Sequence, residues 1–174
     1  MIKLDISKPS KGQSIKTIHF SDTQGVPFRT AYFLNDRLVL DEITEFTGEK
    51  QTQSHTLFNE KYEVIAYQEY LRDSDDQFYG TVDYQMINGE FKKLNTMLFE
   101  VISKENHHLK EKWFNGSGEY IYSVETSDKF HLRYIKPNEQ IVADDDYEFF
   151  IKSKPLGFCE IRNQYLKRIV EENN

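Results

Sequence analysis

Residues that could bind a metal are few and poorly spaced in this sequence. The run beginning at Asp73 opens like a calcium loop, but such a loop needs Gly where this chain has Phe78 and an acid where it has Tyr84. His107 and His108 are adjacent, and neighbouring residues on a strand point to opposite faces, so one metal cannot easily recruit both. We therefore expect no metal site, and we interpret the acidic run as a turn between strands.

Nucleophilic and cofactor chemistry is equally poorly supported. Cys159 is the only cysteine, and a lone cysteine is more often a small buried hydrophobe than a nucleophile. The sequence contains no G-x-S-x-G elbow, no phosphate loop and no dinucleotide-binding glycine run. The segment 115–118 (NGSG) lacks the lysine of a phosphate loop and is typical of a hairpin turn. We predict no catalytic residues and no cofactor.

Charge is unevenly distributed along the chain. The net charge is −7, and the segment 41–90 carries twelve acids against three bases, hence −9. Such a segment repels phosphate, so we expect no nucleic-acid binding, and it attracts a cation or a basic protein. The commoner explanation of an acidic run is a solvated face of a sheet.

One stretch combines acids with aromatic residues. If the segment 61–71 is a strand, Glu63, Tyr67 and Glu69 share one face, although Val64, Tyr67 and Leu71 also fit helical spacing. Tyrosine is enriched at protein interfaces, and acids pair with basic partners. We predict a partner-binding patch made of Glu63, Tyr67, Glu69, Asp73, Asp75, Asp76 and Asp83.

The elements that must position these residues are mostly strands. Alanine occurs only three times, whereas 57 residues are β-branched or aromatic types that favour strands. Short apolar runs alternate with turn residues, and Asn88-Gly89 between two such runs is a strong hairpin signal. The pattern predicts a mostly β protein, an antiparallel meander of about ten strands closed as a barrel or folded as a sandwich-like sheet.

The C-terminal segment has a different periodicity. An apolar stripe at helical spacing predicts an α-helix over about residues 156–172 that packs on the sheet. The stripe consists of Ile161, Tyr165, Leu166, Ile169 and Val170. No linker divides the chain, so we expect a single domain, 1–174, with strands over 1–152.

The sequence also bears on location. No stretch reaches the ~18 apolar residues of a membrane helix, and the first residues lack the apolar region of a signal peptide. A single cysteine excludes a disulfide framework within the chain. We expect a cytoplasmic protein that does not enter membranes.

These features favour a non-catalytic protein-binding module. The chain resembles the immunity proteins of bacterial toxin systems in being small, acidic, single-domain and motif-poor, which implies neutralisation of a basic partner protein. One alternative is a carrier of a small apolar or aromatic ligand with a β-barrel cavity. A second is an enzyme whose site is assembled from scattered strand residues. The oligomeric state is left open.

Overall fold

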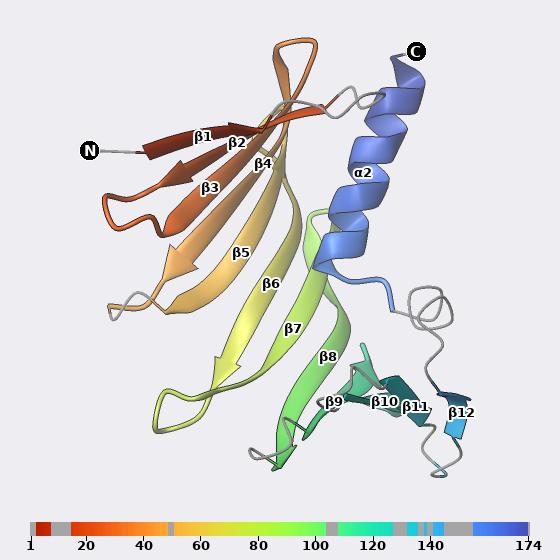
Figure 1. Cartoon of the computed structure of the whole chain (residues 1–174). Coiled ribbons are helices and arrows are strands. Elements are labelled where there is room, and N and C mark those ends of the chain that lie inside the picture. The colour runs from red at the N-terminus through yellow and green to blue at the C-terminus, as the bar shows by residue number, and fades with distance from the viewer. Residues whose placement is uncertain are drawn as a thin grey trace. The chain divides into compact units, whose positions relative to one another are not determined.

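The computed structural model describes residues 3–7, 15–48, 51–103, 108–126, 132–135, 138, 141–144 and 155–173. Within them the chain forms strands and one C-terminal helix (Figure 1). The strands are β1 (Lys3–Ser7), β2 (Ile15–Ser21), β3 (Pro27–Leu34), β4 (Arg37–Phe46), β5 (Thr52–Asn59), β6 (Val64–Arg72), β7 (Phe78–Ile87), β8 (Glu90–Ser103), β9 (His108–Asn115), β10 (Tyr120–Thr126), β11 (Leu132–Ile135) and β12 (Ile141–Asp144). The helix is α2 (Phe158–Glu172).

The twelve strands are hydrogen-bonded in chain order, from β1 to β12. The described strands thus form an open antiparallel meander, and the order does not return to close a barrel. This confirms the mostly β fold and the C-terminal helix. The ambiguous segment 61–71 contributes to β6, a strand, because alternation with its strand neighbours prevails over its weaker helical spacing.

Tight turns between consecutive strands set the register. Asn35 and Asp36 have φ values of 51° and 60°, and Asn88 and Gly89 have φ values of 53° and 83°. Positive φ at both central residues is the type I′ geometry that matches the twist of a hairpin. The predicted hairpin at Asn88-Gly89, with positive φ at the glycine, is confirmed.

A second kind of turn recurs at the ends of four strands and begins at Asp22, Asn59, Asp73 and Asn115, each of which is the last residue of its strand or directly follows it. In the turn at Asp73, one side-chain oxygen accepts hydrogen bonds from the backbone N–H groups of Asp75 and Gln77, both at 2.9 Å. Asp76, three residues after Asp73, adopts a φ of 60°. The run that opens like a calcium loop is therefore a self-capped turn whose first carboxylate binds its own backbone.

By internal contacts the chain divides into two compact units, each built from separate segments. Unit 1 comprises residues 1–69, 85–91 and 158–174, and unit 2 comprises residues 70–84 and 92–157. That the chain folds as one domain stays a prediction.

In unit 1, α2 packs beside the strands (Figure 1). Phe158, the first residue of α2, is buried. Of the predicted stripe, Ile161 is buried and the other members are half-buried. Leu40, Leu57 and Ala66 are fully buried on three successive strands, β4 to β6. The amphipathic stripe thus directs the helix onto the sheet, as the sequence predicts.

In unit 2, alternation divides strands β9 and β10 into an apolar and a charged face. Trp113 and Tyr122 are cross-strand partners, both buried, with their rings stacked at 6.1 Å. On the other face, the Lys110 ammonium lies 3.0 Å from the Glu125 carboxylate. No helix in the described part of the chain is long and apolar enough to cross a membrane.

Candidate functional site

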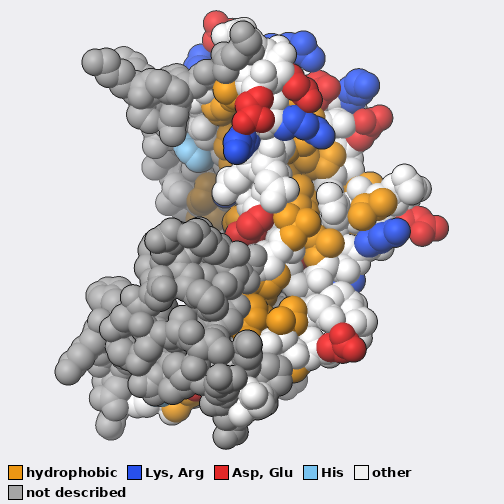
Figure 2. Space-filling model, turned by 90° about the vertical axis from the view of Figure 1, so that its right-hand side faces the viewer, with side chains coloured by type: hydrophobic (Ala, Val, Ile, Leu, Met, Phe, Trp, Pro, Cys, Tyr) orange, Lys and Arg blue, Asp and Glu red, His pale blue; other side chains and the backbone are white. Residues whose placement is uncertain are grey.

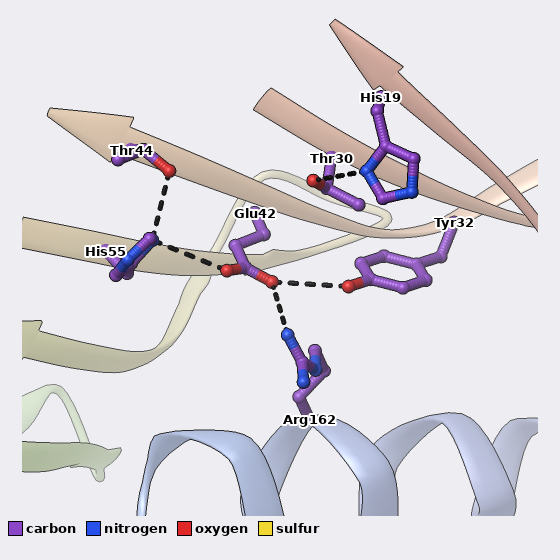
Figure 3. A network of polar contacts seen from close by, with 7 residues as sticks. All are labelled: His19, Thr30, Tyr32, Glu42, Thr44, His55 and Arg162. Atoms are coloured by element: carbon purple, nitrogen blue, oxygen red, sulfur yellow. Dashed lines mark hydrogen bonds and ion pairs between the residues drawn. The ribbon is translucent and has the colours of Figure 1, made fainter. Parts of the chain in front are cut away.

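A polar network in unit 1 centres on Glu42 of β4 (Figure 3). Its Oε2 atom accepts hydrogen bonds from the Tyr32 hydroxyl at 3.2 Å and from Arg162 Nη1 of α2 at 2.9 Å. Its Oε1 atom lies 3.4 Å from Nδ1 of His55, and that nitrogen is 3.0 Å from the Thr44 hydroxyl. We call Glu42, Tyr32, His55 and Arg162 the Glu42 clamp.

Burial and neighbouring charge shift the titration of the clamp. Burial, followed by the nearby Glu42 carboxylate, raises the pKa of Tyr32 to about 12. Burial lowers the pKa of His55 and outweighs the opposing attraction of Glu42. Burial alone would lower the pKa of Arg162, but Tyr32 and Glu42 together outweigh it and raise that pKa. At neutral pH the clamp therefore holds a neutral phenol and a cationic guanidinium.

The clamp joins the helix to the sheet. Its residues come from β3, β4, β5 and α2, and the Glu42–Arg162 bond links positions 120 residues apart. The Phe158 ring lies 5.8 Å from the His55 ring and adds an apolar contact on the same side. The groove between α2 and the sheet of unit 1 is lined by other residues, and the contacts of the clamp link α2 to three strands.

The adjacent acid, Asp41, points to the opposite face of the sheet because successive strand residues alternate. Its carboxylate is 1% exposed. The Nε–H group of Arg29 is shared between the two carboxylate oxygens, Oδ1 at 2.8 Å and Oδ2 at 2.9 Å, and Arg29 Nη2 lies 2.7 Å from Oδ2. The Arg29 guanidinium also lies over the Phe20 ring at 5.0 Å. Asp41 is thus neutralised within the protein and adds little to an external field.

Further along this outer face, strand register brings separate residues together. Glu45 of β4 is the cross-strand partner of Ser54, and Ser54 is the partner of Glu69 on β6. Tyr67, two residues before Glu69, shares its face, and its ring lies 5.8 Å from the ring of Phe91. We call Glu45, Tyr67, Glu69 and Phe91 the outer patch.

The outer patch is accessible, and only one of its two carboxylates has a hydrogen-bond partner among the described residues. Phe91 is 50% exposed, so its ring is accessible to a partner. The Glu45 carboxylate accepts a hydrogen bond from the Ser54 hydroxyl at 2.8 Å. The Glu69 carboxylate has no hydrogen-bond or ion-pair partner among the described residues. The patch therefore presents an aromatic pair beside a free negative charge.

Two of the predicted partner-binding residues, Tyr67 and Glu69, lie together in the outer patch. Glu63 lies in the turn before β6, where its carboxylate accepts a hydrogen bond from the Asn59 side chain at 2.8 Å. It is exposed but does not belong to the same strand face as Tyr67. Its role in binding stays a prediction.

The remaining predicted residues lie in unit 2. Asp73, Asp75 and Asp76 form the turn that follows β6, and Arg72 Nη1 donates a hydrogen bond to the Asp76 carbonyl at 2.9 Å. Asp83 is only 4% exposed, because it lies in the buried middle of β7. The expectation that Asp83 extends an acidic surface is therefore wrong, since a buried carboxylate cannot face a partner.

The sequence analysis did not single out Glu42 or Arg162, and Arg162 is not a member of the apolar stripe. The position of Arg162, directly after Ile161 of the apolar stripe, could have predicted its contact with the sheet. Long cationic side chains at the edge of such a stripe can extend over the surface that the helix covers. The described histidines have separate neighbours: His19 bonds Thr30, and His108 lies 3.5 Å from Glu125. No cluster of metal-ligating side chains occurs among the described residues. His107 and His131 lie outside those residues.

Charges on the side of the molecule where α2 lies are mixed. Figure 2 shows Lys and Arg among Asp and Glu in its upper part, with apolar side chains between them. The outer patch lies on the opposite face of the sheet.

Comparison with known proteins finds no matching family model and no matching curated sequence. The geometry alone must carry the functional argument.

Proposed function

We propose that this protein is a non-catalytic protein-binding module that sequesters a basic partner protein through the outer patch. The observation that carries the proposal is the pairing of exposed Phe91 with Tyr67 beside the unpartnered carboxylate of Glu69. Aromatic side chains supply most of the energy of many interfaces, and adjacent acids steer a basic partner during approach.

The charge around the patch supports a basic partner. Glu45 and Glu69 lie on either side of Ser54, so about two strand spacings, or roughly 10 Å, separate their backbones. One base on this face, Arg29, is already bound to Asp41. A surface lysine or arginine of the partner can therefore approach both carboxylates without competition from Arg29.

Two further expectations belong to this proposal. Negative charge at the patch disfavours phosphate, so nucleic acid is not the intended partner. Cys159 is exposed and forms no disulfide, which suits a reducing compartment such as the cytoplasm. Glu63 is an exposed acid of unit 1 that would extend the steering field beyond the patch. Asp73, Asp75 and Asp76 belong to unit 2, and their part in binding stays a prediction.

The test is retention of proteins from a lysate of the source cells by the immobilised full chain, at low and at high salt. We expect a basic protein that is retained by the parent chain at low salt and lost from Glu69→Lys and from Phe91→Ala. Glu171→Lys reverses an exposed charge at the end of α2, and Ile121→Ala removes an exposed apolar side chain of β10. Both controls should retain the same protein.

Identical retained proteins for the parent chain, the two patch variants and the two controls would overturn the proposal. Melting temperatures of all variants identify any loss that comes from unfolding. Because the altered patch side chains are exposed or half-buried, we expect those temperatures to stay near the parent value.

A further inference from the structure

A second surface of unit 1 has the features of a small-molecule site. A groove of about 330 Å³ runs between α2 and the sheet, and Ile65, Met86 and Ile161 form its apolar part. Gln85, Gln164, Tyr165 and Arg168 complete its lining. This volume is at the lower end of the ~300–1,000 Å³ typical of ligand pockets.

The lining carries one formal charge, and it is positive. Arg168 is the cation, and no acid lines the groove. Its only ion pair among the described residues is with Glu172, at 3.8 Å between side chains that are both 60% exposed. Such an exposed pair is weak and exchanges readily with another anion. The guanidinium is therefore available to a ligand in a protein whose net charge is −7.

The ring of the neighbouring Tyr165 forms the part of the groove that the Arg168 guanidinium contacts. Its hydroxyl donates a hydrogen bond to Glu60 at 2.8 Å, and the Arg168 guanidinium lies over its ring at 5.0 Å. Burial and the Glu60 carboxylate raise the pKa of Tyr165 to about 12. The ring thus stays uncharged and positions the guanidinium at the edge of the groove.

We propose that this groove binds a small monocarboxylate with an apolar body. The guanidinium of Arg168 holds the carboxylate through paired N–H donors, which match its geometry. The side-chain amides of Gln85 and Gln164 can donate to the same group, and the ligand body covers Ile65, Met86 and Ile161. The site is independent of the outer patch, which lies on the other face of the sheet.

The test uses octanoate as the ligand, with NMR of the isotope-labelled full chain. We expect saturable shifts at the methyl groups of Met86, Ile65 and Ile161. Arg168→Gln should weaken octanoate binding by roughly tenfold or more, because a charge-assisted hydrogen bond is lost. Lys167→Gln is the matched control, because Lys167 directly precedes Arg168, pairs with Glu171 at the same 3.8 Å, and does not line the groove.

Two further experiments distinguish binding at a defined site from nonspecific hydrophobic or electrostatic binding. 1-Octanol lacks the carboxylate, so it should bind less tightly than octanoate and be indifferent to Arg168→Gln. Gln164→Trp, a change at an exposed groove residue, should fill the space and abolish the methyl shifts while leaving the melting temperature near that of the parent.

Three results would overturn the proposal. These are the absence of saturable methyl shifts with octanoate, equal weakening by Arg168→Gln and Lys167→Gln, and equal affinities for octanoate and octanol.

Discussion

On the side of the unit 1 sheet that α2 covers, Glu42 accepts hydrogen bonds from Tyr32 and Arg162, whereas on the other side Glu69 has no such partner among the described residues. Both acids belong to the segment that carries −9. One is buried and joins two elements, and the other remains available to a partner molecule. The difference shows that position in the sheet, and not the charge of the segment, decides which acid is held by internal bonds and which acid stays unpaired.

The comparison predicts its largest effect at the Glu42 clamp. Glu42→Ala should lower the free energy of unfolding by about 3 kcal/mol, because it leaves a partly buried guanidinium and a phenol without their acceptor. Glu69→Ala on the outer face should cost less than about 0.5 kcal/mol. Urea unfolding at neutral pH measures both changes, and equal losses would abolish the distinction between the two faces.

A smaller effect is expected at the turn that fixes the register and so keeps the two faces distinct. Gly89→Val should cost about 1–2 kcal/mol, because a β-branched residue is strained at a φ of 83°. Gly48→Val is the control, since Gly48 has no left-handed φ and nothing within 4 Å of an added Cβ. Thermal unfolding should separate them, and similar melting temperatures would show that the turn is not strained.

Acid titration sharpens the comparison at His55. Burial lowers the pKa of His55 in the folded protein. Just below the pKa of ~6.5 of the unfolded chain, His55 is therefore protonated in the unfolded chain and still neutral in the folded protein. The contribution of His55 to the free energy of unfolding is fully present above pH ~6.5 and is lost as the pH falls towards the pKa of the folded protein. Urea unfolding at about pH 7.5 and about pH 5.5 should show a larger loss for the parent than for His55→Gln. Equal losses would mean that His55 titrates freely in the fold.

The smallest change in stability is expected on the outer face. Glu69→Lys should change the free energy of unfolding by less than about 0.5 kcal/mol, because the carboxylate has no partner to lose. Calorimetry of the parent and the variant measures the difference. A loss comparable to that of Glu42→Ala would assign Glu69 a structural role.

Short-range features of the sequence are sufficient to predict the meander. Alternation, the Asn88-Gly89 turn and the apolar stripe of α2 each act over a few residues, and the structure contains all three. The number of strands is larger than expected, and the sheet is open in the described residues, because alternation carries no information on how the two ends of a meander meet.

The Glu42 clamp depends on a contact that no local pattern encodes. The Glu42–Arg162 bond spans most of the chain, and Arg162 lies beside the stripe that the periodicity identifies. The prediction also placed Asp83 with exposed acids, although strand alternation alone cannot reveal that both faces of β7 are covered at its middle. Tyr67 and Glu69 could be found because two residues of one strand face need no long-range information.

The central claim is that the outer patch, rather than the acidic segment as a whole, binds a basic partner. The most direct test is the association rate of the retained partner with the parent, Glu69→Lys and the control Glu171→Lys, measured across a range of salt concentrations. We predict that Glu69→Lys associates more slowly at low salt, by roughly tenfold, and depends less on salt, while the control behaves as the parent does. Equal rates and equal salt dependence for all three proteins would contradict the account.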